Sequence, residues 1–157
     1  MHPDRTSSEV PAPAPGSTGN WSVQQLTGFL ALVSSAEDER TASRVAVERA
    51  VDALGADIGV LFSAGEVVAS VGLEHDAMLE AALADVADGQ TARVMAPGVG
   101  DRPALAITVQ PDTPSRLVFA RETDRDFTPE EVYLARGMAH VLSLSLRMFR
   151  LAAEERR

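Results

Sequence analysis

The residues of this chain best suited to metal chemistry are the adjacent His75 and Asp76. A His-Asp pair can supply two ligands to a metal ion, but a complete site needs further ligands at set positions on helices. The sequence provides no such set, so we expect no metal site. We instead interpret Asp76, or His75, as the N-terminal cap of the helix that follows it.

Other catalytic groups are missing from the sequence. The chain contains no Cys, which excludes a thiolate nucleophile, a disulfide framework and a zinc site that uses sulfur. It also lacks the motifs GxxxxGK[ST], GxGxxG, HExxH and GxSxG. The acidic run ETDRD at 122–126 does not follow the twelve-residue pattern of a calcium loop. His140 is interpreted as a surface residue, with a pH switch in an interface as the alternative. We therefore expect that the chain is not an enzyme and carries no cofactor.

Charge and hydropathy restrict the class of partner. The net charge of −9 argues against nucleic acid or an anionic membrane as a main partner, since phosphate groups require a basic surface. No run of 18 apolar residues is present, and the N-terminus lacks an apolar signal core, so we expect a cytoplasmic protein. All 14 basic residues are Arg, which together with abundant Ala suggests a GC-rich bacterial genome.

The most regular pattern in the chain is a long helix that begins at Phe127–Glu131 (FTPEE) and continues towards Leu151. A Thr cap, a Pro at the first helical position and two Glu in the first turn favour this start. The helix carries two apolar stripes that lie roughly 100° apart around its axis. The first consists of Leu134, Met138, Leu142, Ser145 and Phe149, and the second of Gly137, Val141, Leu144, Met148 and Leu151. One stripe is enough to close a monomeric domain, so the second predicts a partner, unless both are buried within one monomer.

The remainder of the chain predicts two more helices before a block of strands. Residues 1–20 are Pro-rich and lack a periodic apolar face, so we expect a disordered leader followed by one domain over 21–157. A first helix is indicated by Leu26, Phe29, Leu30 and Val33, and a second by Val47, Val51 and Leu54 with Gly55 as its cap.

Short runs rich in strand formers then follow. They predict a hairpin at 57–63 and 66–71, a helix from Asp76 to Gly89, and strands at 92–96, 104–110 and 116–122. Pro97–Pro103 (PGVGDRP) is expected to be a loop. Strands in one block with helices at both ends predict an α+β fold around an antiparallel sheet.

The segments GADIGVLF, ALAITVQP and SRLVFAR, with the closing DFTPEEVYLARGMAHVLSLSLR, resemble a GAF domain over roughly residues 21–157. GAF domains are sensor modules of bacterial histidine kinases, cyclic-dinucleotide enzymes, phosphatases and transcription regulators. The resemblance implies an antiparallel sheet of five to six strands with the N- and C-terminal helices packed on one face. It also implies a small-molecule pocket on the other face and dimerisation through the terminal helices.

Some properties of the family do not transfer to this sequence. The lack of Cys excludes a covalently attached bilin and the sulfoxide reductase activity of some members, and the NKFDE residue set of the cyclic-nucleotide-binding members is missing. The segment that roofs the pocket in ligand-binding members is reduced here to PGVGDRP. The residues expected to line any pocket are Phe62, His75, Met78, Leu79, Met95 and Arg102. Ordinary core packing is the alternative for the Met and Phe side chains, and a haem or flavin pocket is not expected.

These observations predict a regulatory domain of a bacterial signal-transduction protein that forms a homodimer. The expected dimer seam consists of Leu26, Phe29, Val141, Leu144, Met148 and Leu151. The domain would control an output domain beyond Arg157 by shifting the last helix in response to a signal or a small molecule. The alternative is a structural dimerisation scaffold with a collapsed pocket and no ligand.

Overall fold

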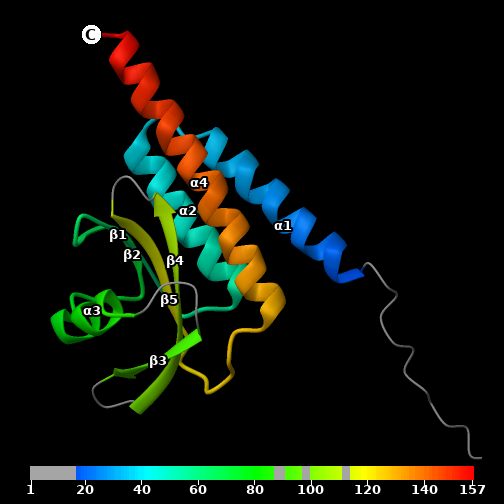
Figure 1. Ribbon diagram of the computed structural model, residues 1–157, viewed down its shortest axis with the longest axis vertical. Coiled ribbons are helices and arrows are strands. Elements are labelled where there is room, and N and C mark those ends of the chain that lie inside the picture. The colour runs from blue at the N-terminus through cyan, green and yellow to red at the C-terminus, as the bar shows by residue number, and fades with distance from the viewer. Residues whose placement is uncertain (1–16, 87–90, 97–99, 111–113) are drawn as a thin grey trace, which may run out of the picture.

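The computed structural model describes residues 17–86, 91–96, 100–110 and 114–157 (Figure 1). Four helices and five strands are found in these ranges. In chain order they are α1 (Ser17–Ser34), α2 (Glu39–Leu54), β1 (Ile58–Ser63), β2 (Glu66–Val71), α3 (Ala77–Ala84), β3 (Thr91–Ala96), β4 (Gly100–Gln110), β5 (Ser115–Ala120) and α4 (Pro129–Glu155). Within these ranges, no helix combines the length and the apolar content needed to cross a membrane.

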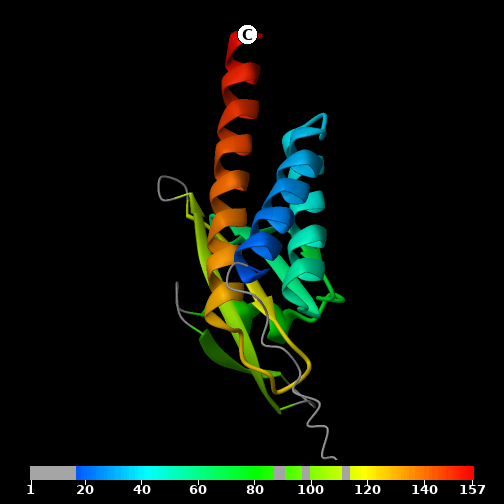
Figure 2. The same ribbon diagram turned by 90° about the vertical axis from the view of Figure 1, so that its right-hand side faces the viewer.

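The five strands form one sheet in the order β2-β1-β5-β4-β3, and every neighbouring pair is antiparallel. Helices α2 and α4 pack on one face of the sheet, and α3 lies on the other face (Figure 1). Helix α1 lies over α2 and α4 rather than on the sheet itself (Figure 2). The predicted α+β fold with terminal helices on one side of an antiparallel sheet is therefore confirmed.

The alternation of side chains along the strands creates two cores. On β4 and β5, Leu105, Ile107, Leu117 and Phe119 point towards α2 and α4, where they join the larger apolar cluster. The intervening residues, among them Ala106, point towards α3 and belong to the second cluster. Small residues on this second side allow α3 to pack close to the sheet through Leu79 and Leu83.

The helix ends follow the predicted capping residues. Thr128 accepts a hydrogen bond from the Glu131 backbone N–H at 3.2 Å, and Glu131 Oε1 accepts one from the Thr128 N–H at 2.9 Å, which completes a capping box. Gly55 ends α2 in the left-handed conformation at φ +60°, which a residue without Cβ adopts at little cost. Asp76 caps α3 with bonds from the N–H groups of Met78 and Leu79.

Three predicted boundaries are wrong. Helix α1 begins at Ser17, so residues 17–20 belong to it and not to the expected leader, and the rest of that leader (1–16) lies outside the described residues. Helix α3 ends at Ala84 with Asp85 as its C-cap, before the expected Gly89, which is itself outside the described residues.

The expected loop at 97–103 is the third wrong boundary. Residues 100–103 belong to β4, because the β3–β4 ladder continues to the pair Ala96–Gly100. Pro103 has no backbone N–H to donate, but the hydrogen bond to Arg121 uses its carbonyl oxygen, which accepts the Arg121 N–H at 3.1 Å. Proline is therefore tolerated at this end of the strand. Residues 97–99 are outside the described part of the chain.

Candidate functional site

The residues predicted to line a pocket do not form one site. Phe62 and Leu79 meet in the core beneath α3, where they are 5% and 8% exposed. Arg102 lies on the same side of the sheet, opposite Val94, and its buried Nε has no hydrogen-bond partner among the described residues. Met95 is on the opposite side of the hairpin from Val94 and is 67% exposed. The side of the sheet under α3 is thus occupied by packed side chains.

His75 and Met78 lie near the start of α3 and face solvent. His75 has a φ of +59° and, together with Ser70 and Glu80, lines a shallow groove between β2 and α3. In the described ranges, no three His, Asp or Glu side chains are grouped so that they could hold a metal ion. Asp76 takes the capping role that the sequence analysis assigned to it.

The residues of the predicted dimer seam are divided between the interior and the surface. Phe29 is 0% exposed and packs inside the protomer, so it offers no surface to a second chain. Leu26 is partly buried against Gly137, where its side chain would lie 2.9 Å from a Cβ placed on that glycine. Val141 is also partly buried, at the edge of the larger core.

The other three residues of the predicted seam are exposed. Leu144, Met148 and Leu151 are 47%, 71% and 55% exposed along one side of α4. Leu30 on α1 is 49% exposed, unlike its neighbour Phe29, which the sequence analysis had assigned to the seam. We name these four side chains, Leu30, Leu144, Met148 and Leu151, the apolar α1/α4 surface.

The geometry of α1 and α4 places these side chains on adjacent helices that run in the same direction. Leu26 contacts Gly137, and further along both helices Val33 lines a groove together with Ser145 and Met148. Helix α4 continues past the turn between α1 and α2 (Figure 2). A row of large apolar side chains on such a helix is typical of a surface that is covered by a partner.

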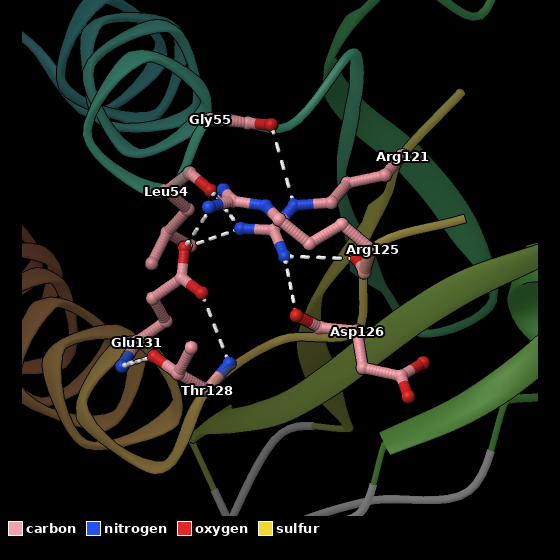
Figure 3. Close-up of polar contacts among 7 residues, drawn as sticks. All are labelled: Leu54, Gly55, Arg121, Arg125, Asp126, Thr128 and Glu131. Carbon is pink, nitrogen blue, oxygen red and sulfur yellow. Dashed lines mark hydrogen bonds and ion pairs between the residues drawn. The ribbon is translucent and has the colours of Figure 1, made fainter. Parts of the chain in front are cut away.

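A buried arginine connects this helix to the sheet, and the sequence analysis did not identify it. The side chain of Arg121 is 1% exposed, and its guanidinium lies between the end of α2 and the start of α4 (Figure 3). It donates to the carbonyl oxygens of Leu54 (2.6 Å), Gly55 (3.4 Å), Arg125 (3.1 Å) and Asp126 (2.8 Å). The spacing of Arg121 from Leu117 and Phe119 was the available signal, since residues at i and i+2 share one side of a strand.

Glu131 completes this arrangement from the first turn of α4. Its Oε2 accepts a hydrogen bond from Arg121 Nη2, while its other oxygen caps the helix. Burial on its own would raise the pKa of Glu131, but the bonds from Thr128 and Arg121 and the positive charge of Arg121 together lower it. Phe127 covers the guanidinium, with 4.0 Å between Arg121 Cζ and the ring centroid. We name Arg121, Glu131 and the four carbonyl groups the arginine hub.

Comparison with known proteins provides structural but not sequence matches. No family model and no curated protein matches the sequence. The GAF domain of a proposed sensor histidine kinase from Pseudomonas syringae pv. tomato is similar at a TM-score of 0.66 and 16% identity, with 89% of this chain and 96% of that chain covered. The GAF domain of a phosphoenolpyruvate-protein phosphotransferase from Coxiella burnetii gives 0.62 and 19%, with 88% and 99% covered.

A bacteriophytochrome from the photosynthetic bacterium R. palustris is similar over a part of its length. The match covers 96% of this chain and 40% of that chain, at a TM-score of 0.61 and 15% identity. At these identities the similarities concern the fold.

Proposed function

We propose that this chain, which has the GAF-domain fold, is a regulatory domain of a bacterial signalling protein that pairs through α1 and α4 and controls an output domain. The observation that carries the proposal is the apolar α1/α4 surface, with Leu144, Met148 and Leu151 about half or more exposed on one helix. The structurally similar domains belong to a phosphotransferase, a proposed histidine kinase and a bacteriophytochrome, which supports a role in signalling.

The energetics favour pairing through both helices. Because the side chains of the apolar α1/α4 surface are about half exposed, covering one of them adds roughly 1–2 kcal/mol. The three on α4, taken from both chains, would contribute about 6–12 kcal/mol, against an association cost of about 4–15 kcal/mol. Leu30 on the adjacent helix α1 is also about half exposed, which supports a seam made by both helices.

The oligomeric state tests the proposal directly. Light scattering should give a dimer for the wild-type chain and a monomer for the variant Leu144→Asp/Met148→Asp. The matched control is Met78→Asp, because Met78 on α3 is 69% exposed and Met148 is 71% exposed. The control should remain a dimer. A monomeric wild-type chain, or a double variant that still dimerises, would contradict the proposal.

A second candidate function is a dimerisation scaffold that binds no small molecule. It is favoured by the direct packing of α3 on the sheet through Leu79 and Leu83, beside Phe62. A thermal-shift screen with nucleotides and metabolites separates the two candidates. A compound that raises the melting temperature, and loses this effect in an Arg102→Gln variant, would favour a sensor with a ligand near Arg102, whereas a screen without hits would favour the scaffold.

A further inference from the structure

The start of α4 is connected to the far edge of the sheet by a second arginine. Arg93 on the edge strand β3 forms ion pairs with Asp101 on β4 (Nε–Oδ2, 3.3 Å), with Asp126 (Nη1–Oδ1, 3.4 Å) and with Asp124. Asp124 and Asp126 belong to the segment between β5 and α4. One side chain therefore links the β3–β4 hairpin to the segment that leads into α4.

Asp126 connects Arg93 to the arginine hub. Its carboxylate pairs with Arg93, and its backbone carbonyl accepts a hydrogen bond from Arg121 Nη1 at 2.8 Å. Arg121 in turn binds Glu131 in the first turn of α4. The contacts thus form an unbroken series from Arg93 through Asp126 and Arg121 to Glu131.

Arg93 joins the β3–β4 hairpin to the segment before α4 at a point near the end of the β4–β5 ladder. The ladder between β4 and β5 ends at the pair Ala104–Ala120, whereas β3 and β4 remain paired as far as Ala96–Gly100. The described ends of β3 and β4 therefore extend beyond the last β4–β5 pair. Val94, next to Arg93 on β3, is buried in the core beneath α3. Neighbouring residues of β3 thus contact α3 on one side of the sheet and the segment before α4 on the other.

The two halves of this series differ in exposure. The Arg121–Glu131 pair is buried, with side chains 1% and 12% exposed, so breaking it would leave a charge without its partner. The side chains around Arg93 are 42–79% exposed, and ion pairs of this kind are weak and screened by salt. The outer half can therefore open without unfolding the domain.

We propose that this series is a coupling device, in which Arg93 releases or holds the segment before α4 according to the position of β3 under α3. The proposal rests on the proposed function, since it assigns to α4 the role of the helix that carries the signal. A change in packing at Val94 would move Arg93, and the loss of its ion pairs would loosen Asp126, the arginine hub and the first turn of α4.

Hydrogen exchange measured by mass spectrometry on the full chain tests this coupling. In Arg93→Gln, we expect protection to fall about twofold to fivefold in the peptides that cover 121–128 and the first turn of α4, with little change in melting temperature. Arg150→Gln is the matched control, because Arg150 loses an equally exposed ion pair with Glu39 but does not contact this segment. The control should leave exchange in these peptides unchanged.

The combination of Arg93→Gln with Val94→Ala separates coupling from local loosening. If Arg93 transmits the state of the α3 side, Val94→Ala alone should raise exchange in the first turn of α4, and it should have no further effect in the Arg93→Gln background. Equal effects of Val94→Ala in both backgrounds, or unchanged exchange in Arg93→Gln, would overturn the proposal. These readouts do not depend on the dimer, so light scattering on the same samples shows separately whether the proposed seam holds.

Discussion

The replacement Arg121→Met tests whether the arginine hub holds α4 in place. The change preserves most of the apolar stem, but it removes every donor of the guanidinium. Four carbonyl oxygens then lose the donor that Arg121 supplies, and Glu131, whose side chain is 12% exposed, retains a negative charge without its main cation. Loss of one partner from a buried ion pair costs about 3–5 kcal/mol.

This magnitude is large relative to the stability of the whole domain. Domains of ordinary size unfold with about 5–15 kcal/mol, so the variant should lose a third or more of its stability in a typical case. The melting temperature should fall by about 6–20 °C. Urea unfolding at one fixed protein concentration provides the measurement, because a dimer would make the midpoint depend on concentration.

Two further variants identify the cause of the loss. Arg147→Met changes an exposed arginine of α4 and should alter stability by less than about 0.5 kcal/mol. Arg121→Met/Glu131→Gln removes both charges, while the introduced amide oxygen can still cap α4, so the double variant should be more stable than Arg121→Met alone. A loss below about 1 kcal/mol for Arg121→Met, or a double variant less stable than the single one, would refute this reasoning.

Three other predictions concern particular contacts. Gly59→Ala would place a Cβ 2.4 Å from Val51 Cγ2, and it should lower the urea midpoint by an amount equivalent to about 1–3 kcal/mol; an unchanged midpoint would show that β1 and α2 separate easily. The pKa of Glu131 is lowered in the folded state, so the ionised carboxylate stabilises the fold. This contribution to the free energy of unfolding is fully present above the ordinary glutamate pKa of about 4.3, and it is lost as the pH falls through the folded-state pKa. Acid unfolding should therefore depend less on pH in Glu131→Gln, and identical pH curves would contradict that sign. Asp76→Ala removes the cap of α3 and should cost about 1 kcal/mol, visible as faster hydrogen exchange in that helix while α4 stays unchanged.

The parts of the fold that the sequence predicts well depend on neighbouring residues. The capping box of Thr128 and Glu131, the Gly55 cap and the alternation of Leu105, Ile107 and Val109 all arise from contacts within a few positions. The order of helices and strands follows from these local patterns, while the GAF-like architecture was implied by the resemblance to that family, and the structure confirms both.

Contacts between distant residues were not predictable from one sequence. Arg121 binds Leu54 across 67 positions, and nothing near either residue indicates that a strand end and a helix end will meet. The sequence analysis likewise placed Phe29, rather than Leu30, at the surface. Both are apolar neighbours on α1, and only the position of α2 and α4 determines which of them is buried.

The difference between local patterns and long-range contacts also explains why the residues predicted to line a pocket do not lie together in the structure. Phe62 and Leu79, two of the residues expected to line a pocket, pack in one cluster beneath α3. Met78 and Met95 are exposed instead, because Met78 lies on the outer side of α3 and Met95 faces away from it on the hairpin. A hydrophobic residue type alone does not determine the direction in which its side chain points.

The proposed role of α4 depends on where this helix is held and where it is free. Its 27 residues span about 40 Å, and its buried side chains end at Leu146. The arginine hub and the core hold the first two thirds of α4 against the sheet, so a movement there is carried along the helix. Beyond Leu146, contacts within the protomer include the partly buried Phe149 and the exposed pair of Arg150 with Glu39. A tilt of about 5° at the hub would move the far end by about 3–4 Å. A seam at Met148 and Leu151 lies where such a shift is largest, and this is why a partner at that position would detect a small change in the sheet.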